Sequence, residues 1–144
     1  MPGITYWLMK TEPGEYSYSD LEQAGRDVWD GVKNFAALKN IKNMQPGDLA
    51  FIYHTGKEKS VTGVALVASG PYPDPRQEGL YMVDLTAGYR LNRPVSLARI
   101  KSDPAFANWE LVRLPRLSVM PVPAEFWAKV HHMADTPQFN AVQK

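Results

Sequence analysis

The stretch Gly47–Thr55 reads GDLAFIYHT and carries the clearest strand signal in the chain. Its apolar and aromatic run, Leu49–Tyr53, follows a glycine and an aspartate and is closed by two polar residues. A short apolar run between turn-forming residues is typical of a buried β-strand. We therefore predict a strand over Asp48–His54, with Asp48 as the turn residue that leads into it.

Similar runs on both sides of this stretch predict a β-rich chain. Directly after it, Thr55–Ser60 contains a glycine and mixed charges, as a hairpin loop would. Farther on, residues 81–85 alternate between large apolar side chains and others, which fits a half-buried strand. Further strands are predicted at Thr5–Lys10, Val61–Ala68, Tyr81–Leu85 and Leu117–Val119, the last closed by Pro121.

Short helices are predicted between and after these strands. Ser19 and Glu22 have the spacing of a capping box, and Gly25 would end the helix that they begin. Along Val32–Met44 apolar residues recur about every three positions, which indicates helical turns that end before the following proline. Two more helices are predicted at Ser96–Lys101 and Pro123–Val130.

Length and composition predict one domain over residues 1–144, with its motifs between about residues 4 and 130 and a polar tail after Ala134. Cysteine is absent, which excludes disulfides and thiolate sites and fits a cytoplasmic location. Neither a signal peptide nor a membrane span is expected. Strands separated by short helices predict an α+β fold, a small β-barrel with helices inserted between and flanking the strands.

The charge is nearly balanced, with 16 basic and 15 acidic residues. A protein that holds nucleic acid mainly through phosphates is usually more basic than this. A nucleic-acid role would therefore need a local cationic strip together with a specific pocket. The candidate phosphate contacts are Arg26, Lys33, Lys39, Lys42 and Arg116, and their alternative interpretation is a solvated charged face.

Trp29, in the sequence VWDGV, is the strongest candidate for contact with a ligand. Its indole offers a flat face on which a base can stack, and Gly31 permits a turn that leaves the ring at a cavity mouth. Packing in the core is the competing interpretation, because large aromatic side chains commonly serve that purpose. The residues alone leave both interpretations open.

Polar residues near the ends of the predicted strands are further candidates. Lys10 and Glu12 follow the first strand, and a solvated surface pair is their alternative interpretation. Asn34 offers an amide donor and acceptor that suit a base edge, but asparagine is equally a favoured helix cap. The remaining candidates carry an aromatic ring, an imidazole or a hydroxyl: Tyr53, His54, Thr55 and Ser118.

Four segments together resemble the EVE domain, a member of the PUA-like superfamily that also contains the YTH readers of methylated RNA. They are Tyr6–Pro13 (YWLMKTEP), Trp29–Asn34 (WDGVKN), Gly47–Thr55 and Arg116–Val122 (RLSVMPV). The resemblance implies a PUA-like barrel with an aromatic pocket in which Trp29 takes part. One departure is that Phe35–Lys39 reads FAALK, where the family pattern is Tyr-Gln-Ala-Arg-Asn.

On this resemblance the chain is expected to be a nucleic-acid-binding module rather than an enzyme. A single base, modified for example by methylation, would leave its stack and lie on Trp29. Tyr53 and Trp7 would complete the aromatic cage, and neither a cofactor nor a metal is expected. The expected binding residues are Trp7, Lys10, Glu12, Trp29, Val32, Asn34, Tyr53, His54, Thr55 and Ser118.

Two alternatives stay open beside this expectation, and both DNA and RNA are admitted as partners. The same pocket would suit a free nucleoside or another small planar ligand, as in a sensor. A hydrolase resembling the PUA-like ASCH proteins would use carboxylates such as Glu12, Asp30 and Asp48, although their spacing does not require a metal. The adjacent His131 and His132 would point to different sides of a helix and make a poor metal site.

Overall fold

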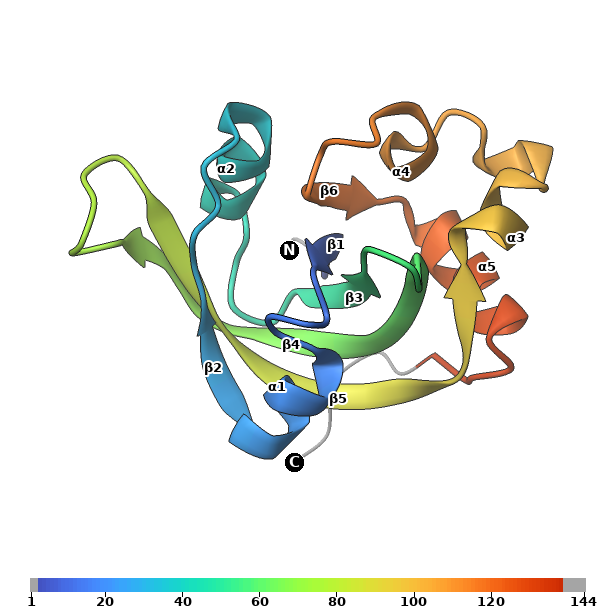
Figure 1. Ribbon diagram of the computed structural model, residues 1–144, viewed down its shortest axis with the longest axis horizontal. Helices are drawn as coiled ribbons and strands as arrows, with labels where there is room; N and C mark the ends of the chain where they lie inside the picture. Colours follow the sequence, from blue (N-terminus) through green and yellow to red (C-terminus); the bar gives the residue numbers. More distant parts are fainter. Residues whose placement is uncertain (1–2, 139–144) are drawn as a thin grey trace.

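The structure is a computed structural model that describes residues 3–138, and within them one mixed β-sheet organises the chain (Figure 1). The strands are β1 (Tyr6–Thr11), β2 (Arg26–Trp29), β3 (Leu49–His54), β4 (Ser60–Pro73), β5 (Tyr81–Ser96) and β6 (Val119–Val122). The helices are α1 (Tyr18–Ala24), α2 (Phe35–Lys42), α3 (Leu97–Lys101), the 3-10 helix η1 (Pro104–Phe106), α4 (Glu110–Arg113) and α5 (Ala124–Met133).

The strand order across the sheet is β2-β5-β4-β3-β1-β6, with β1 parallel to β3 and the other described pairings antiparallel. The long strands β4 and β5 shift register at several irregularities, which bend strands. Figure 1 shows both strands curving around β3 and β1. The predicted α+β class is confirmed. No described pairing joins β2 to β6, so the described sheet is open rather than a closed barrel.

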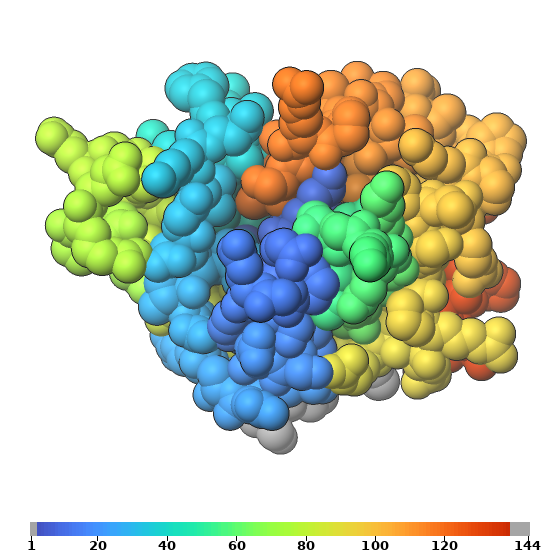
Figure 2. All heavy atoms as spheres, in the orientation of Figure 1, coloured from blue at the N-terminus to red at the C-terminus, as the bar shows by residue number. Residues whose placement is uncertain are grey.

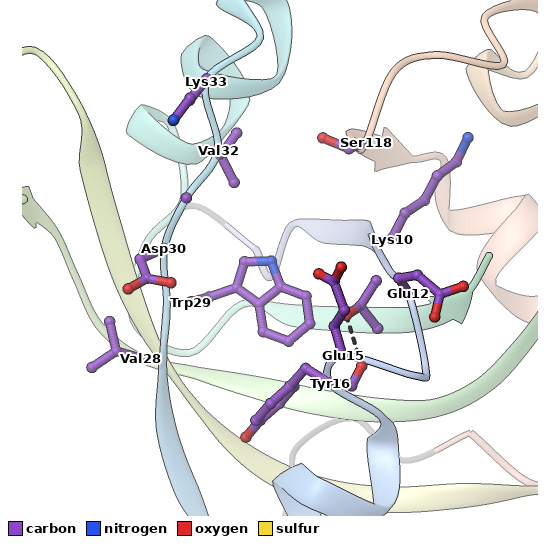
Figure 3. A pocket seen from close by; sticks show the side chains of 12 residues that line it. Lys10, Glu12, Glu15, Tyr16, Val28, Trp29, Asp30, Val32, Lys33 and Ser118 are labelled. Atoms are coloured by element: carbon purple, nitrogen blue, oxygen red, sulfur yellow. Dashed lines mark hydrogen bonds between the residues drawn. The ribbon is translucent and has the colours of Figure 1, made fainter. Parts of the chain in front are cut away.

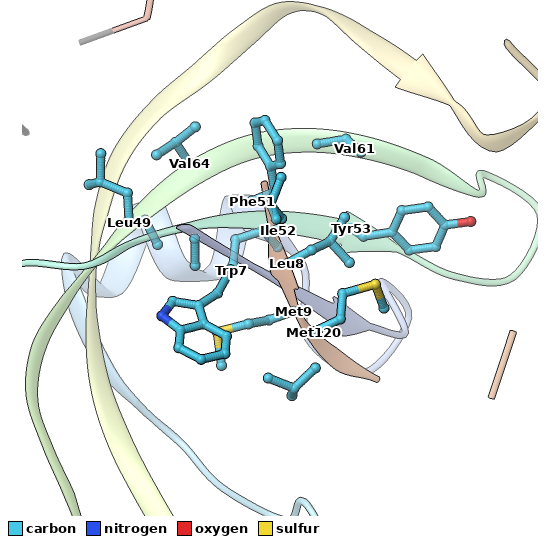
Figure 4. Packing of buried hydrophobic residues seen from close by; sticks show 14 of the residues in the cluster. Trp7, Leu8, Met9, Leu49, Phe51, Ile52, Tyr53, Val61, Val64 and Met120 are labelled. Carbon is cyan, nitrogen blue, oxygen red and sulfur yellow. The ribbon is translucent and has the colours of Figure 1, made fainter. Parts of the chain in front are cut away.

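Strand β3 lies at the centre of the apolar core, which explains why its sequence carries the strongest signal. Every residue of this strand is buried. A strand covered on both faces shows a continuous apolar run rather than an alternating one. Figure 4 shows side chains of β1 and β3 packed together beside Met120 of β6. On α5, the ring of Trp127 stacks on Phe51 with their centroids 4.0 Å apart.

Two helices begin at positions other than the predicted ones, and their caps give the reason. Ser17 caps α1 by accepting from the N–H of Asp20, whose carboxylate in turn accepts from the N–H of Ser17. The capping box therefore begins at Ser17, which corrects the prediction at Ser19. The end of α1 at Gly25, with φ of 76°, is as predicted. Similarly, α2 begins after its cap Asn34 and not at Val32.

The sequence patterns do not predict β2, η1 or α4, and they end β4 and β5 too early. Pro121, expected to close the last strand, instead lies inside β6 opposite Trp7. Proline is tolerated there because β6 is an edge strand of the described sheet. The first part of the predicted polar tail is docked, since the N–H of Asn92 donates to Thr136 Oγ1 at 2.7 Å.

Residues 139–144 of that tail lie outside the described residues. Among the helices between residues 3 and 138, none combines the length and apolarity needed to cross a lipid bilayer.

Candidate functional site

A cavity of about 430 Å³ opens beside Trp29, at the end of β2. It is bounded by β1 and the turn that follows it, by the segment between β2 and α2, and by the residue before β6 (Figure 3). We call it the Trp29 cavity. Its lining residues are Lys10, Thr11, Glu12, Glu15, Tyr16, Val28, Trp29, Asp30, Gly31, Val32, Lys33 and Ser118.

The indole of Trp29 is held by its neighbours but still reaches the cavity. Trp29 is the last residue of β2, pairs with Val83 of β5 and is 9% exposed. Tyr16 packs edge-to-face against it, with ring centroids 5.9 Å apart and planes at 87°. Gly31, with φ of 75°, turns the chain away directly afterwards. Figure 3 shows the indole pointing from its strand into the space between Tyr16 and Lys10.

Tyr16 is itself fixed by a hydrogen bond at the cavity wall. Its hydroxyl donates to Asp27 Oδ2 at 2.6 Å. Burial, with a further contribution from this bond to Asp27, raises the pKa of the Tyr16 hydroxyl well above its usual range. The phenol therefore stays protonated and keeps its orientation, and the ring stays against the indole of Trp29.

Lys10 and Ser118 lie on the opposite wall and join β1 to the segment before β6. The ammonium of Lys10 donates to the carbonyl oxygen of Pro115 at 2.9 Å and lies over the ring of Tyr53, 5.6 Å from its centroid. Burial lowers the pKa of this ammonium. The backbone N–H of Lys10 donates to the carbonyl oxygen of Ser118 at 2.9 Å, which places the Ser118 side chain at the cavity.

The three carboxylates of the lining differ in what they contact. Glu12 Oε1 accepts from the N–H of Gly14 at 2.6 Å. Asp30 forms an ion pair with Arg76. Glu15 has no hydrogen bond or ion pair through its side chain among residues 3–138, and Figure 3 shows its carboxylate beside the indole. The hydroxyl of Ser118 is equally without a partner there, so an acceptor and a hydroxyl remain available to a ligand.

The structure brings part of the predicted set to one place and puts the rest elsewhere. Lys10, Glu12, Trp29, Val32 and Ser118 line the Trp29 cavity together with Lys33 from the predicted phosphate contacts. The predicted binding residues that do not line it are Trp7, Asn34, Tyr53, His54 and Thr55.

Trp7 lies in the core and does not complete a cage around the cavity. It is 5% exposed, and its indole N–H donates to Asp48 Oδ2 at 2.9 Å. Asp48 also accepts from the backbone N–H groups of Thr5 and Gln45, at 3.2 and 2.9 Å. A buried indole N–H needs an acceptor, and here Asp48 supplies it while tying the start of β3 to β1.

The segment after β3 also makes internal contacts. His54 is 6% exposed, and its Nε2 accepts from the N–H of Tyr18 at 3.0 Å. Its Nδ1 must then carry the proton that is shared with Glu58 Oε1 at 2.8 Å. The hydroxyl of Thr55 donates to the carbonyl oxygen of Thr11 at 3.3 Å. These side chains therefore hold the turn after β3 against its neighbours.

Tyr53 and Asn34 lie next to the cavity lining without joining it. Tyr53 is 3% exposed and lies beneath the ammonium of Lys10. Burial raises the pKa of its hydroxyl. Asn34 Oδ1 accepts from the N–H of Ala37 at 3.0 Å, which makes Asn34 the cap of α2.

The predicted phosphate contacts do not form one continuous strip. Arg26 pairs with Asp84 of β5 at 2.9 Å, and Lys42 lies over the ring of Tyr81, 5.0 Å from its centroid. Lys39 shares the outer face of α2 with Phe35, a side chain that is 84% exposed. Lys33 lines the Trp29 cavity, whereas Arg116 lines a separate groove beside it.

The expected set of binding residues omitted half of the lining: Thr11, Glu15, Tyr16, Val28, Asp30 and Gly31. Of these, Gly31 was expected only as a turn and Asp30 only as a carboxylate of the hydrolase alternative. Two of these residues could have been found from their position in the sequence, because Glu15 and Tyr16 directly follow the Pro13-Gly14 turn that ends the first motif. Asp30 and Gly31 belong to the second motif, but strand β2, which directly precedes them and fixes their position, was not predicted. Within the described part of the chain, no cluster of three metal-ligating side chains occurs.

Two proteins from eukaryotes are similar in sequence to this chain. An uncharacterised protein of Schizosaccharomyces pombe is 29% identical over 92% of this chain and 70% of its own length. Human thymocyte nuclear protein 1 is 33% identical over 51% of this chain. The latter match spans 38% of the human protein, so most of that protein lies outside the comparison.

Solved structures with the same fold include a protein of Rhodopseudomonas palustris, with a TM-score of 0.89 and 36% identity over 94% of this chain and 97% of that one. Human thymocyte nuclear protein 1, solved in complex with DNA containing 5-methylcytosine, has a TM-score of 0.84 and 26% identity over 93% of this chain and 99% of that one. An ASCH protein of Zymomonas mobilis, at 17% identity and a TM-score of 0.57, shares the fold alone.

An independent family match agrees with the fold. Residues 5–133 match the EVE domain, which includes all three segments that line the Trp29 cavity. The chain therefore belongs to the EVE domain family.

Proposed function

We propose that this chain binds DNA that carries a modified base, with 5-methylcytosine as the first candidate, and holds that base in the Trp29 cavity. The observation that carries the proposal is the indole of Trp29 at a cavity with an unpaired carboxylate and hydroxyl. The related human structure, solved with DNA containing 5-methylcytosine, supports this choice of partner. The proposed activity is recognition without covalent chemistry.

The size and the aromatic wall of the cavity suit a single base. Its volume of about 430 Å³ lies in the range typical of small-ligand sites. Stacking of a base on an aromatic side chain stabilises binding by about 1–3 kcal/mol, against a cost of a few kcal/mol for leaving the DNA stack. The apolar side chain of Val32 also lines the cavity, and a methyl group that leaves water there gains roughly 0.8 kcal/mol.

The polar groups of the lining fit the edge of cytosine. The carboxylate of Glu15 accepts hydrogen bonds, and a carboxylate is a suitable partner for the exocyclic amine of cytosine. The hydroxyl of Ser118 and the ammonium of Lys10 donate, and cytosine presents a carbonyl oxygen and a ring nitrogen as acceptors. Thymine carries the same methyl group but an oxygen in place of the amine, so it would face the Glu15 carboxylate unfavourably.

A free planar ligand is the second candidate, because the lining of the cavity is nearly balanced in charge. It contains two lysines and three carboxylates, so it does not by itself attract a phosphate backbone. A thermal-shift comparison separates the candidates. A sensor should be stabilised by free 5-methyl-2′-deoxycytidine as strongly as by a short oligonucleotide that contains the same base, whereas a DNA-binding module should prefer the oligonucleotide.

The direct test is a titration of fluorescent oligonucleotides that differ only in one cytosine or 5-methylcytosine. The wild-type protein should bind the methylated form several-fold more tightly, because burial of one methyl carbon is worth roughly 0.8 kcal/mol of binding free energy. Trp29→Phe should keep most of this preference because it keeps a stacking face, whereas Trp29→Ala should lose it. Equal affinity of the wild-type protein for both forms would refute the proposal.

A further inference from the structure

A second hollow of about 360 Å³ lies next to the Trp29 cavity, between the start of α2 and the segment that leads to β6. We call it the α2 groove. Figure 2 shows these two segments, in cyan and orange, side by side on one face of the molecule. The groove is lined by Asn34, Ala36, Arg113, Leu114, Pro115, Arg116 and Leu117.

The groove and the cavity are neighbours along both of their walls. Lys33 lines the cavity, and the next residue, Asn34, lines the groove. On the facing wall Ser118 lines the cavity, and the preceding Leu117 lines the groove. The ammonium of Lys10, a cavity residue, holds the carbonyl oxygen of Pro115 in the groove wall. A chain that leaves the cavity between these walls therefore passes directly into the groove.

The walls of the groove are apolar and its charges are cationic. Leu114 is 43% exposed although it is a large apolar side chain. Arg113 donates through Nε to the carbonyl oxygen of Asn108 at 2.9 Å, which leaves its outer nitrogens unbonded among the described residues. Arg116 is exposed and has no hydrogen bond or ion pair there. No carboxylate of residues 3–138 lines the groove.

We infer that the α2 groove binds the nucleotide next to the base held at Trp29, on the same DNA strand. This inference rests on the proposed function. Arg116 and Arg113 contact phosphate oxygens, for which a guanidinium fork is well suited. Leu114 and its apolar neighbours cover the sugar and the face of the base. The groove thus supplies affinity that does not depend on which base is read, while the cavity supplies the selection.

The experiment measures binding of a short single-stranded oligonucleotide, with either cytosine or 5-methylcytosine at its centre, over a series of salt concentrations. Arg116→Ala and Arg113→Ala should each reduce the slope of log affinity against log salt by about 0.7 per lost phosphate contact. Both should leave the ratio of affinities for the two oligonucleotides unchanged. Binding of the free nucleoside 5-methyl-2′-deoxycytidine, which has no phosphate, should also stay as in the wild type.

Arg93→Ala is the matched control, because Arg93 is exposed on β5 and lines neither hollow. Slopes for Arg113→Ala and Arg116→Ala that equal the slope of Arg93→Ala would overturn the inference. So would a lost preference for 5-methylcytosine in Arg116→Ala, since the groove would then touch the selected base itself. A wild-type protein without any preference would instead count against the proposed function, whatever the slopes.

Discussion

Among the described residues, the lining of the Trp29 cavity contains two lysines and three carboxylates, whereas the α2 groove contains two arginines and no carboxylate. In the cavity several of these charges already have partners, such as Pro115 for Lys10 and Arg76 for Asp30. In the groove Arg116 has none among the described residues. Base contacts specify a sequence and phosphate contacts provide position and affinity. We therefore expect the cavity, whose charges nearly balance, to select the base, and the cationic groove to attach the phosphate backbone.

Removal of the indole should have the largest effect and should act on the cavity without changing the phosphate contacts of the groove. Trp29→Ala should weaken binding of the 5-methylcytosine oligonucleotide by about 1–3 kcal/mol, roughly 5- to 150-fold, because the stacking face is lost. The salt dependence should stay as in the wild type because the arginines of the groove remain. Titrations at several salt concentrations check both points.

The control for this variant is its folded state, since the indole is largely buried and truncation of a buried tryptophan costs about 3–5 kcal/mol of stability. Circular dichroism and thermal unfolding should therefore accompany the titration, and Trp29→Phe provides a milder change. A folded Trp29→Ala protein with wild-type affinity and preference would contradict the proposal that the cavity selects the base and the groove holds the phosphate.

Replacement of the unpaired carboxylate should alter which base is accepted. Glu15→Gln offers an amide N–H to the oxygen of thymine, so the preference for 5-methylcytosine over thymine should fall by about 1 kcal/mol, roughly fivefold. The preference for 5-methylcytosine over cytosine should not change, because both bases carry the amine. Competition titrations with the three bases at one position measure both ratios.

The matched control for Glu15→Gln is Glu125→Gln on α5, which removes one exposed carboxylate that lines neither hollow. If both variants change the thymine ratio equally, the effect is one of net charge and not of base recognition.

The two hollows should also differ in their response to pH. Burial lowers the pKa of Lys10, so its ammonium loses its proton earlier than an ordinary lysine as the pH rises toward 10.5. Affinity should then fall roughly twofold to fivefold, as expected for about 0.5–1 kcal/mol from one partly exposed charge. The arginines stay charged over this range. An oligonucleotide of cytosine, 5-methylcytosine and adenine avoids bases that titrate at high pH.

Lys10→Met should bind as the wild type does at high pH and should show no further loss. A fall of the same size in Lys10→Met would assign the pH response to another group.

The smallest effect is expected at the outer edge of the cavity. Arg76 pairs with Asp30 and Asp74, and its own side chain is 67% exposed. Exposed ion pairs contribute only about 0.2–1 kcal/mol. Arg76 does not itself line the Trp29 cavity, so only part of this free energy should reach the ligand. Arg76→Met should change the affinity for both oligonucleotides by roughly twofold or less, without altering their ratio. A large loss of preference would show that the position of Asp30 takes part in selection.

Two tryptophans show how far the sequence predicts this site. Trp7 and Trp29 both occur in the family motifs and are 5% and 9% exposed. Asp48, 41 residues away in the chain, satisfies the indole N–H of Trp7. The indole N–H of Trp29 has no partner among the described residues and is not enclosed as that of Trp127 is. Only the partner across the sheet distinguishes the two, and periodicity does not reveal it.

The fold is predicted best where local patterns and packing agree. β3 shows a continuous apolar run because it is central, and Gly25 ends α1 because its left-handed φ suits glycine. The short strand β2 carries exposed Arg26 and Val28, so its alternation is too brief to be recognised. Without β2, the placement of Glu15 and Tyr16 against Trp29 cannot be derived. The motifs therefore predict part of the lining of the Trp29 cavity, but not the wall that Glu15 and Tyr16 form.

The four tryptophan indole N–H signals in a ¹H–¹⁵N NMR spectrum test the central claim most directly. On addition of a short oligonucleotide with one 5-methylcytosine, the signal of Trp29 should shift strongly. The signals of Trp7, bonded to Asp48, and Trp109, whose N–H points to the carbonyl oxygen of Pro121, should stay in place. Saturated binding with an unmoved Trp29 signal would contradict the claim that this indole receives the base.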